Sequence, residues 1–291
     1  MTGPRAAGER RPAAPRSTRA VEMLHGCAPS WRPGAQCLRN YVPYESLERH
    51  LRARREPYAP LSETAARDAL TVDDSTVGAA CACLLAREAG HAVTLFVNPA
   101  QIARGRTYWF SRLDALLDAR TVARAAFGGR EFDLVPGGPL RAFRLAAKAR
   151  LMAVDEEDTD PLLDELAERL GAGAPGVPEH ARTLRLETLL ELVDRGVEIG
   201  SHGWGHRDIA SLEPGEVVRD LRRAAEWFRS TLGFAPAHYA VPYGLSRLPD
   251  GAAGEVPGMI LLASSELELG AVGGRHWNRR DLTSDLQGRP A

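Results

Sequence analysis

Short apolar runs alternate with amphipathic stretches along most of the chain. Residues 69–72 and 91–97 have the composition of buried strands, and residues 76–88 between them have the spacing of a helix. A strand, a helix and a second strand within about thirty residues form a βαβ unit, which requires parallel strands. The beginning of the chain therefore predicts a parallel sheet, preceded by a strand at 21–24 and an amphipathic helix at 44–56.

The same alternation resumes in the last third of the chain. Helices are predicted at 186–195 and 214–232, and strands at 197–200, 237–241 and 258–264. The helix at 214–232 has one apolar stripe, with arginine and glutamate side chains facing away from it. Strands and helices that alternate in this way favour a βα barrel or a doubly wound sheet. The absence of G-x-G-x-x-G from the first βαβ unit argues against a dinucleotide-binding fold.

Residues from about 100 to about 180 interrupt this pattern. They predict three helices, at 108–127, 139–154 and 159–171, which we interpret as a helical insertion on the main fold. The acidic run at 155–160 is typical of a helix start rather than a cation site. Residues 1–20 are basic and rich in proline and predict a disordered tail, so we expect a single domain over residues 21–291.

Composition excludes several functional classes. The 37 Lys and Arg residues balance 38 Asp and Glu residues, so the charge does not favour nucleic acid or an anionic membrane as a partner. No run is long enough to cross a bilayer, and the N-terminus lacks the apolar segment of a secretory signal, which predicts a cytoplasmic protein. The 4 cysteines have no zinc-finger spacing, and we expect free thiols.

Polar residues follow two of the predicted strands. Asp73 and Asp74 come directly after residues 69–72, and functional groups gather at the carboxyl ends of parallel strands. Neighbours on a strand point to opposite faces, so one carboxylate can bind a cation while the other accepts a proton. The alternative is that Asp74 only caps the helix from Thr76. His202 and His206 follow the strand at 197–200, and with a strand-end aspartate they would form an open catalytic metal site.

The segments TVDD (71–74), HGWGH (202–206) and VPYG (241–244) occur in the order of three family motifs. They resemble T-F-D-D-G, H-[ST]-x-x-H and R-x-P-Y-G of the polysaccharide deacetylase family, the nodulation-protein-B homology domain of carbohydrate esterase family four. The LHG segment at His25 also resembles an early strand end of that family. The resemblance extends from about Val21 to the C-terminal region, and it implies a distorted, incomplete (β/α) barrel of the α/β class.

The resemblance also implies the roles of the site residues. Asp73 would be the catalytic base, and Asp74, His202 and His206 would bind a divalent metal ion, with Zn²⁺ as the default. The backbone N–H of Tyr243 would stabilise the oxyanion, although a simple turn is the alternative for this segment. The implied reaction is hydrolysis of an N-acetyl, sometimes O-acetyl, group by metal-activated water.

The chain departs from the family motifs at three positions, where Ser75 replaces Gly, Gly203 replaces Ser or Thr, and Ala240 replaces Arg. The missing arginine normally orients the base. Arg279 or Arg280 in the segment HWNRRDL is expected to replace it, because many relatives carry an arginine near this position.

The family's general acid is also missing from its usual place, because no late L-x-H segment is present. His276 and His25 are the candidates for the general acid, and His238, inside a strand, is expected to be structural.

These observations predict a metal-dependent deacetylase that acts on a small N-acetylated sugar, aminocyclitol or biosynthetic intermediate. The insertion is expected to close the open groove that a polymer would need. One alternative is a C–N hydrolase for a cyclic or other non-acetyl amide. Another is a catalytically inactive binding homologue, which the loss of arginine at Ala240 would favour. The sequence does not indicate the oligomeric state.

Overall fold

The computed structural model describes residues 20–29, 32, 34–61, 67–154, 158–263, 269–273 and 275–288. The predicted tail lies outside these residues except for Ala20, and so does the first half of the acidic run at 155–160. The tail prediction and the division into one domain therefore remain predictions. None of the described helices combines the length and the apolar character needed to cross a membrane.

A nine-stranded sheet forms the centre of the molecule, with the strand order β11-β12-β10-β9-β8-β5-β4-β1-β13. All neighbouring pairs are parallel except β11 with β12. The described strands do not close on themselves, which agrees with the predicted α/β class and an incomplete barrel. The strands are β1 (Val21–Leu24), β4 (Ala69–Val72), β5 (Thr94–Val97), β8 (Glu198–Ser201), β9 (Tyr239–Ala240), β10 (Ile260–Leu262), β11 (Gly270–Gly273), β12 (His276–Asn278) and β13 (Arg280–Asp281).

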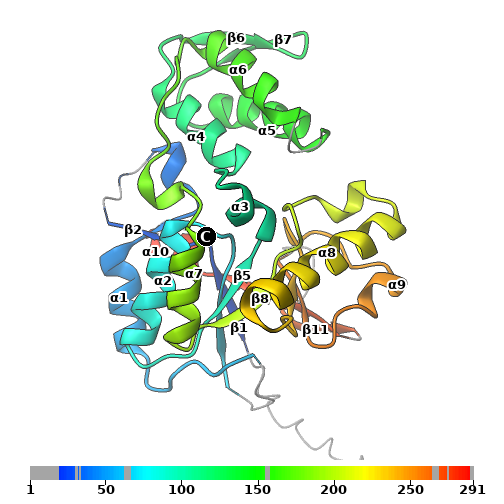
Figure 1. Ribbon diagram of the computed structural model, residues 1–291. Coiled ribbons are helices and arrows are strands. Elements are labelled where there is room, and N and C mark those ends of the chain that lie inside the picture. Colours follow the sequence, from blue (N-terminus) through cyan, green and yellow to red (C-terminus); the bar gives the residue numbers. More distant parts are fainter. Residues whose placement is uncertain are drawn as a thin grey trace, which may run out of the picture.

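Helices cover both sides of this sheet (Figure 1). On one side lie α1 (Tyr44–Ala53), α2 (Val77–Glu88) and α7 (Leu186–Asp194), and on the other α8 (Pro214–Leu232) and α9 (Asp250–Ala253). Helix α2 begins where the Thr76 side chain accepts a hydrogen bond from the Ala79 N–H, at 3.1 Å. Helix α8 begins with a capping box of Glu213 and Glu216. The remaining short elements are β2 (Cys27–Ala28), η1 (Gln36–Leu38), β3 (Val42–Pro43), α3 (Pro99–Arg104), η3 (Glu179–Ala181), η4 (Ile209–Ser211) and α10 (Thr283–Leu286).

The segment between β5 and α7 forms a lobe at the top of Figure 1. It has a hydrophobic cluster of its own, built around Leu113, Phe143 and Leu166, each fully buried. Through α3, the lobe is attached to the carboxyl end of β5, the edge at which functional groups of parallel sheets gather. Its elements are α4 (Trp109–Ala119), β6 (Arg124–Phe127), β7 (Arg130–Asp133), α5 (Gly138–Met152) and α6 (Thr159–Leu170).

The prediction of one helix over residues 108–127 is wrong. Helix α4 ends at Ala119, and residues 124–127 pair with 130–133 as an antiparallel hairpin. Gly128 and Gly129 both have positive φ, 59° and 74°, as a tight two-residue hairpin turn requires. The mostly apolar residues 122–127 are compatible with the period of a helix or of a strand, and the Gly-Gly pair that follows them favours the hairpin.

Candidate metal centre and active site

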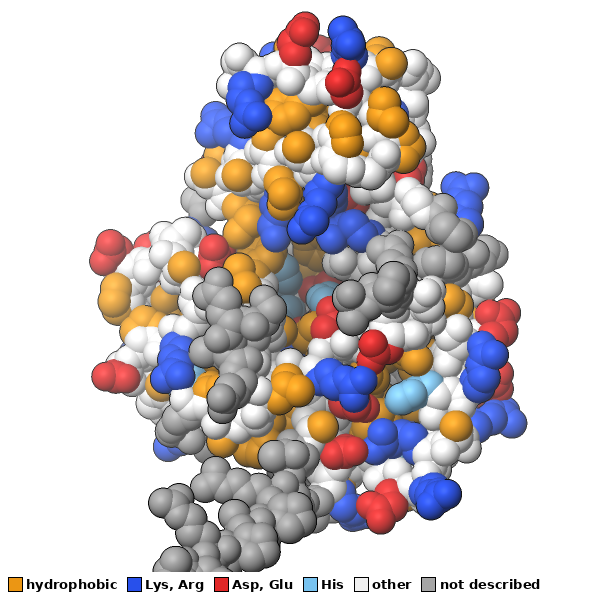
Figure 2. All heavy atoms as spheres, turned by 180° about the vertical axis from the view of Figure 1, so that it is seen from behind, with side chains coloured by type: hydrophobic (Ala, Val, Ile, Leu, Met, Phe, Trp, Pro, Cys, Tyr) orange, Lys and Arg blue, Asp and Glu red, His pale blue; other side chains and the backbone are white. Residues whose placement is uncertain are grey.

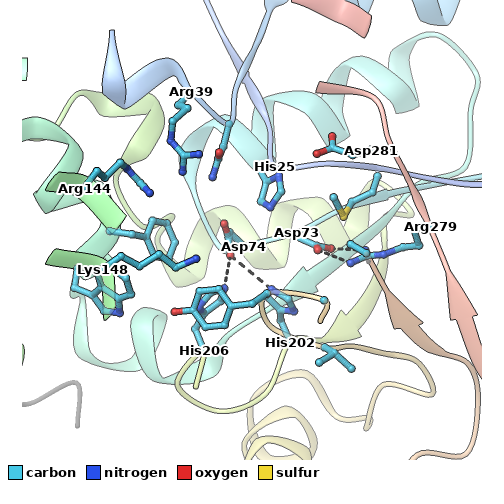
Figure 3. A pocket seen from close by; sticks show the side chains of 18 residues that line it. His25, Arg39, Asp73, Asp74, Arg144, Lys148, His202, His206, Arg279 and Asp281 are labelled. Atoms are coloured by element: carbon cyan, nitrogen blue, oxygen red, sulfur yellow. Dashed lines mark hydrogen bonds and ion pairs between the residues drawn. The ribbon is translucent and has the colours of Figure 1, made fainter. Parts of the chain in front are cut away.

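Loops at the carboxyl ends of β1, β4, β8, β9 and β12 meet around one cavity of about 230 Å³ (Figure 3). Because these strands are parallel neighbours in one sheet, their carboxyl ends lie along the same edge. The sheet thus brings together residues that are far apart in the sequence. Those that line the cavity include His25, Asp73, Asp74, His202, His206, Tyr243 and Arg279.

Asp74, His202 and His206 form a buried cluster of possible metal ligands. One ligand atom from each residue lies within 4.8 Å of the others. Asp74 Oδ1 is 3.2 Å from His206 Nε2 and 3.7 Å from His202 Nε2. One carboxylate oxygen and two imidazole nitrogens are a donor set that suits Zn²⁺.

The protonation of the cluster fits a divalent cation. The His202 ring is 2.8 Å from the Ala240 carbonyl through Nδ1, so Nδ1 carries the proton and Nε2 presents a lone pair toward Asp74. Burial, with a smaller contribution from His206, lowers the pKa of His202 to about 4. Burial alone would raise the pKa of Asp74, but the close approach of His206 and the charges of His25 and His202 lower this pKa to about 2. Asp74 Oδ1 is buried and accepts no well-aligned hydrogen bond from the described residues, so a cation is the partner that would satisfy it.

Backbone strain is concentrated in the site. Among the described residues other than glycine, only Asp74, His206 and Tyr243 have positive φ, at 70°, 58° and 62°. Such conformations cost about 1–3 kcal/mol each and persist where the surrounding structure enforces them. The interactions of the surrounding fold therefore offset the strain that places these three residues in the site.

A ring of hydrogen bonds joins the loop after β4, which contains Asp73 and Asp74 (the aspartate loop), to the loop 202–206 after β8 (the histidine loop). The Asn98 side chain donates to the carbonyls of His202 and Gly203 and accepts from the Tyr108 hydroxyl at 2.8 Å. The Tyr108 oxygen accepts the Ser75 N–H, and Ser75 Oγ accepts the Asn98 N–H, both at 2.8 Å. Ser75, which departs from the family motif, thus takes part in holding the site together.

Asp220 on α8 braces the histidine loop from outside. It accepts the Trp204 N–H at 2.8 Å, and a Cβ at Gly203 would lie only 2.9 Å from Asp220 Oδ2. Gly203 also has φ +76°, so glycine permits both the turn and the close approach. Asp220 and Asn98 were missed by the sequence analysis. Asn98 could have been found, because it directly follows the predicted strand at 91–97.

Arg279 forms a buried, two-pronged ion pair with Asp73. Nη1 and Nη2 donate to the two carboxylate oxygens at 2.7 Å each, and both residues are 3% exposed. Arg279 Nε also donates to the Leu262 carbonyl at 3.2 Å, which fixes the guanidinium plane. Burial would raise the pKa of Asp73, but the charge of Arg279 holds it below its usual value. Of the two predicted arginines, Arg279 thus reaches Asp73, whereas Arg280 is exposed and pairs with Asp285 at 2.6 Å.

The two candidate general acids lie in different places. His276 begins β12 and pairs with Ile260, at the end of the strand opposite to Arg279, and it does not line the cavity. His25 follows β1 and does line the cavity. This placement does not support His276 as the general acid and favours His25. His238 accepts the Met259 N–H at 3.0 Å, which agrees with the structural role expected for it.

Replacing Asn98 with alanine is expected to lower metal affinity by about 10–100-fold, because such outer hydrogen bonds orient the ligands. The change also leaves buried carbonyls without a donor, which should cost about 1–3 kcal/mol of unfolding free energy. Metal titration and urea denaturation measure the two effects. Ser230→Ala, on the exposed side of α8, is the control and should change neither. Unchanged metal affinity in Asn98→Ala would mean that the histidine loop keeps its shape without this ring.

Comparison with known proteins agrees with this architecture. Residues 172–249 match the family model described as polysaccharide deacetylase. A search of curated protein sequences finds no significant match.

Solved deacetylases share the fold at low sequence identity. The deacetylase PplD of Streptococcus pyogenes, solved in complex with acetate, has a TM-score of 0.56 and 13% identity over 91% of this chain and 92% of its own. IcaB from Ammonifex degensii has a TM-score of 0.53 and 14% identity over 94% of both chains. A polysaccharide deacetylase from Bacillus cereus has a TM-score of 0.53 and 12% identity over 91% of this chain and 64% of its own. The shared fold and the family-model match confirm the resemblance to the polysaccharide deacetylase family.

Proposed function

We propose that this protein is a metal-dependent deacetylase in which Asp74, His202 and His206 hold a divalent cation, with Zn²⁺ as the default, and Asp73 is the general base. The observation that carries the proposal is the different surroundings of two adjacent carboxylates. Asp74 faces two imidazole nitrogens, while Asp73 is held by Arg279 at 2.7 Å through both oxygens. One carboxylate is therefore suited to bind a cation and the other to accept a proton.

When bound, the cation would supply Lewis acidity, which makes water more acidic and polarises the acyl carbonyl. Arg279 keeps Asp73 ionised at neutral pH and fixes its orientation, and each carboxylate oxygen has a second lone pair that can accept a proton from water. Hydration of the acyl carbon and cleavage of its bond to nitrogen yield acetate and an amine. The amine nitrogen must gain a proton as it leaves.

Two other cavity residues are assigned to this reaction. His25 is the candidate donor of the proton to the leaving amine, since it lines the cavity and His276 does not. The Tyr243 N–H is the candidate donor to the developing oxyanion, and the positive φ of 62° at Tyr243 indicates that the surrounding structure enforces the conformation of this loop.

The size of the cavity favours a small substrate. Its volume of about 230 Å³ is below the usual range of ligand sites, roughly 300–1,000 Å³. Trp109 and Phe110 of α4 and Lys148 of α5 form one wall, so the lobe borders the site directly. We therefore propose a small N-acetylated compound rather than a polymer. The alternative of an inactive binding homologue relied on Ala240, and the contact of Arg279 with Asp73 removes that support.

The test is metal analysis followed by an acetate-release screen over small N-acetyl compounds. We expect about one Zn²⁺ or similar ion per chain, loss of activity on chelation and recovery on adding Zn²⁺ back. His202→Ala should lose the bound ion, whereas His180→Ala, outside the cavity, should keep it. A purified protein that binds no metal and releases no acetate would contradict the proposal. A ring-opened product without acetate would favour a C–N hydrolase instead.

A further inference from the structure

Three cationic side chains line the wall of the cavity that faces the lobe. Arg39 follows η1, and Arg144 and Lys148 lie one turn apart on the same face of α5. Figure 3 shows all three pointing into the cavity, on the side away from Asp73 and Arg279. In Figure 2, Lys and Arg side chains gather along the upper rim of the hollow in which histidine side chains are visible.

Within this basic wall, Arg144 has a carboxylate partner among the described residues and Lys148 has none in contact. Arg144 is 6% exposed and donates to both oxygens of Asp114, at 2.6 and 3.0 Å. Lys148 has no carboxylate within ion-pair distance among the described residues, and its ammonium lies 4.6 Å from the centre of the Tyr243 ring. Burial, then repulsion by Arg144 and Arg39, lowers the pKa of Lys148. Among the described residues, Asp114 therefore pairs with Arg144 and no carboxylate contacts Lys148, so a bound anion would offset the charge of Lys148.

The basic wall lies close to the candidate metal centre. The Tyr243 ring separates the two, since its centre is 4.6 Å from the Lys148 ammonium and 4.8 Å from the centre of the His206 ring. A single sugar-sized molecule can therefore reach both. The two positive charges of a bound divalent cation would exceed the single negative charge of Asp74. The occupied metal centre would therefore have no negative charge left to neutralise the basic wall.

We propose that the acetylated substrate carries an anionic group, a carboxylate or a phosphate, that binds the basic wall of Arg39, Arg144 and Lys148. The inference rests on the proposed function, because it takes the acetyl group to lie at the candidate metal centre. Ammonium and guanidinium groups form charge-assisted hydrogen bonds with both kinds of anion, and a guanidinium can bind either through two parallel bonds. A neutral acetylated sugar would leave the charge of Lys148 uncompensated in a partly buried site.

The test compares one neutral acetylated sugar with derivatives of it that carry an anionic group. The panel is N-acetylglucosamine, its 6-phosphate, its 1-phosphate and the corresponding 6-carboxylate, with kcat/KM for acetate release measured for each. We expect at least one anionic compound to exceed the neutral sugar by roughly 10-fold or more, since one charge-assisted hydrogen bond contributes about that much. Preference between the phosphates and the carboxylate identifies the anion.

Two variants of α5 make the comparison specific. Lys148→Gln should reduce the preference for the anionic compound, the ratio of its kcat/KM to that of the neutral sugar, by roughly 10-fold. The matched control is Arg141→Gln, two turns earlier on α5, where the side chain is exposed and does not line the cavity. An anionic preference that is absent from the wild type, or unchanged in Lys148→Gln, would overturn the inference.

A binding measurement separates this inference from the proposed reaction. Calorimetry with Asp73→Asn protein and the same four compounds measures the anionic preference without turnover. If the anionic compounds bind more tightly and Lys148→Gln removes this preference, the basic wall is an anion subsite even when no acetate is released. If acetate is released equally from neutral and anionic compounds, the result supports the proposed deacetylase activity and contradicts the anion subsite. Failure of every anionic compound to bind would also overturn the subsite.

Discussion

Asp73→Asn is expected to lower acetate release by about 10²–10⁴-fold, the usual contribution of a general base. Asparagine has nearly the same shape, and its amide oxygen can still accept a hydrogen bond from Arg279. It cannot accept a proton from water, so the loss should appear in kcat. Asp74 and the two histidines are untouched, and metal content should therefore stay at the wild-type value. Steady-state kinetics and metal analysis of one preparation measure both effects.

The control for this change is Asp133→Asn, an exposed aspartate on the hairpin of the lobe. It removes the same charge far from the cavity and should leave both kcat and metal content unchanged. An Asp73→Asn enzyme that keeps its metal and more than half of its activity would exclude Asp73 as the base. Loss of metal together with activity would instead indicate that both adjacent carboxylates serve the metal centre.

The regular elements of the fold could be predicted because their periodicity is explicit. Helix α8 has the predicted bounds Pro214–Leu232, and β4 has the predicted bounds Ala69–Val72. Helix α8 buries one apolar stripe and β4 is buried along its whole length, so the local sequence pattern is enough to predict each element. The hairpin of β6 and β7 could not be predicted in this way, because its apolar residues fit both the helical and the strand period. The glycines of the turn decide for the hairpin.

The candidate site was predictable as far as it depends on strand ends. Asp74, His202 and His206 each follow a strand of one parallel sheet, and this topology alone brings them to one edge. Contacts that join distant segments follow from tertiary packing and could not be deduced in advance. Arg279 lies 206 residues from Asp73, and nothing local distinguished it from Arg280. The position of the basic wall depends in the same way on how α5 packs beside the loop at Arg39.

Arg279→Met is expected to lower the free energy of unfolding by about 3–5 kcal/mol, because it leaves the Asp73 carboxylate buried without its partner. It should also lower kcat, since the base loses the two hydrogen bonds that orient it. Urea denaturation monitored by circular dichroism measures the stability. The control is Arg124→Met, whose ion pair with Asp133 lies at the exposed surface and should contribute no more than about 1 kcal/mol.

The double variant Asp73→Asn with Arg279→Met distinguishes an ion pair from simple packing. Each single change leaves one buried charge unpaired, whereas the double change removes both charges, so its destabilisation should be smaller than the sum of the two. Arg279 also contacts the Leu262 carbonyl and the Thr71 hydroxyl, and those contacts are lost in either background. Additive destabilisation in this cycle would assign the effect of Arg279 to these other contacts. Asp73 would then need a different residue to hold it beside the candidate metal centre.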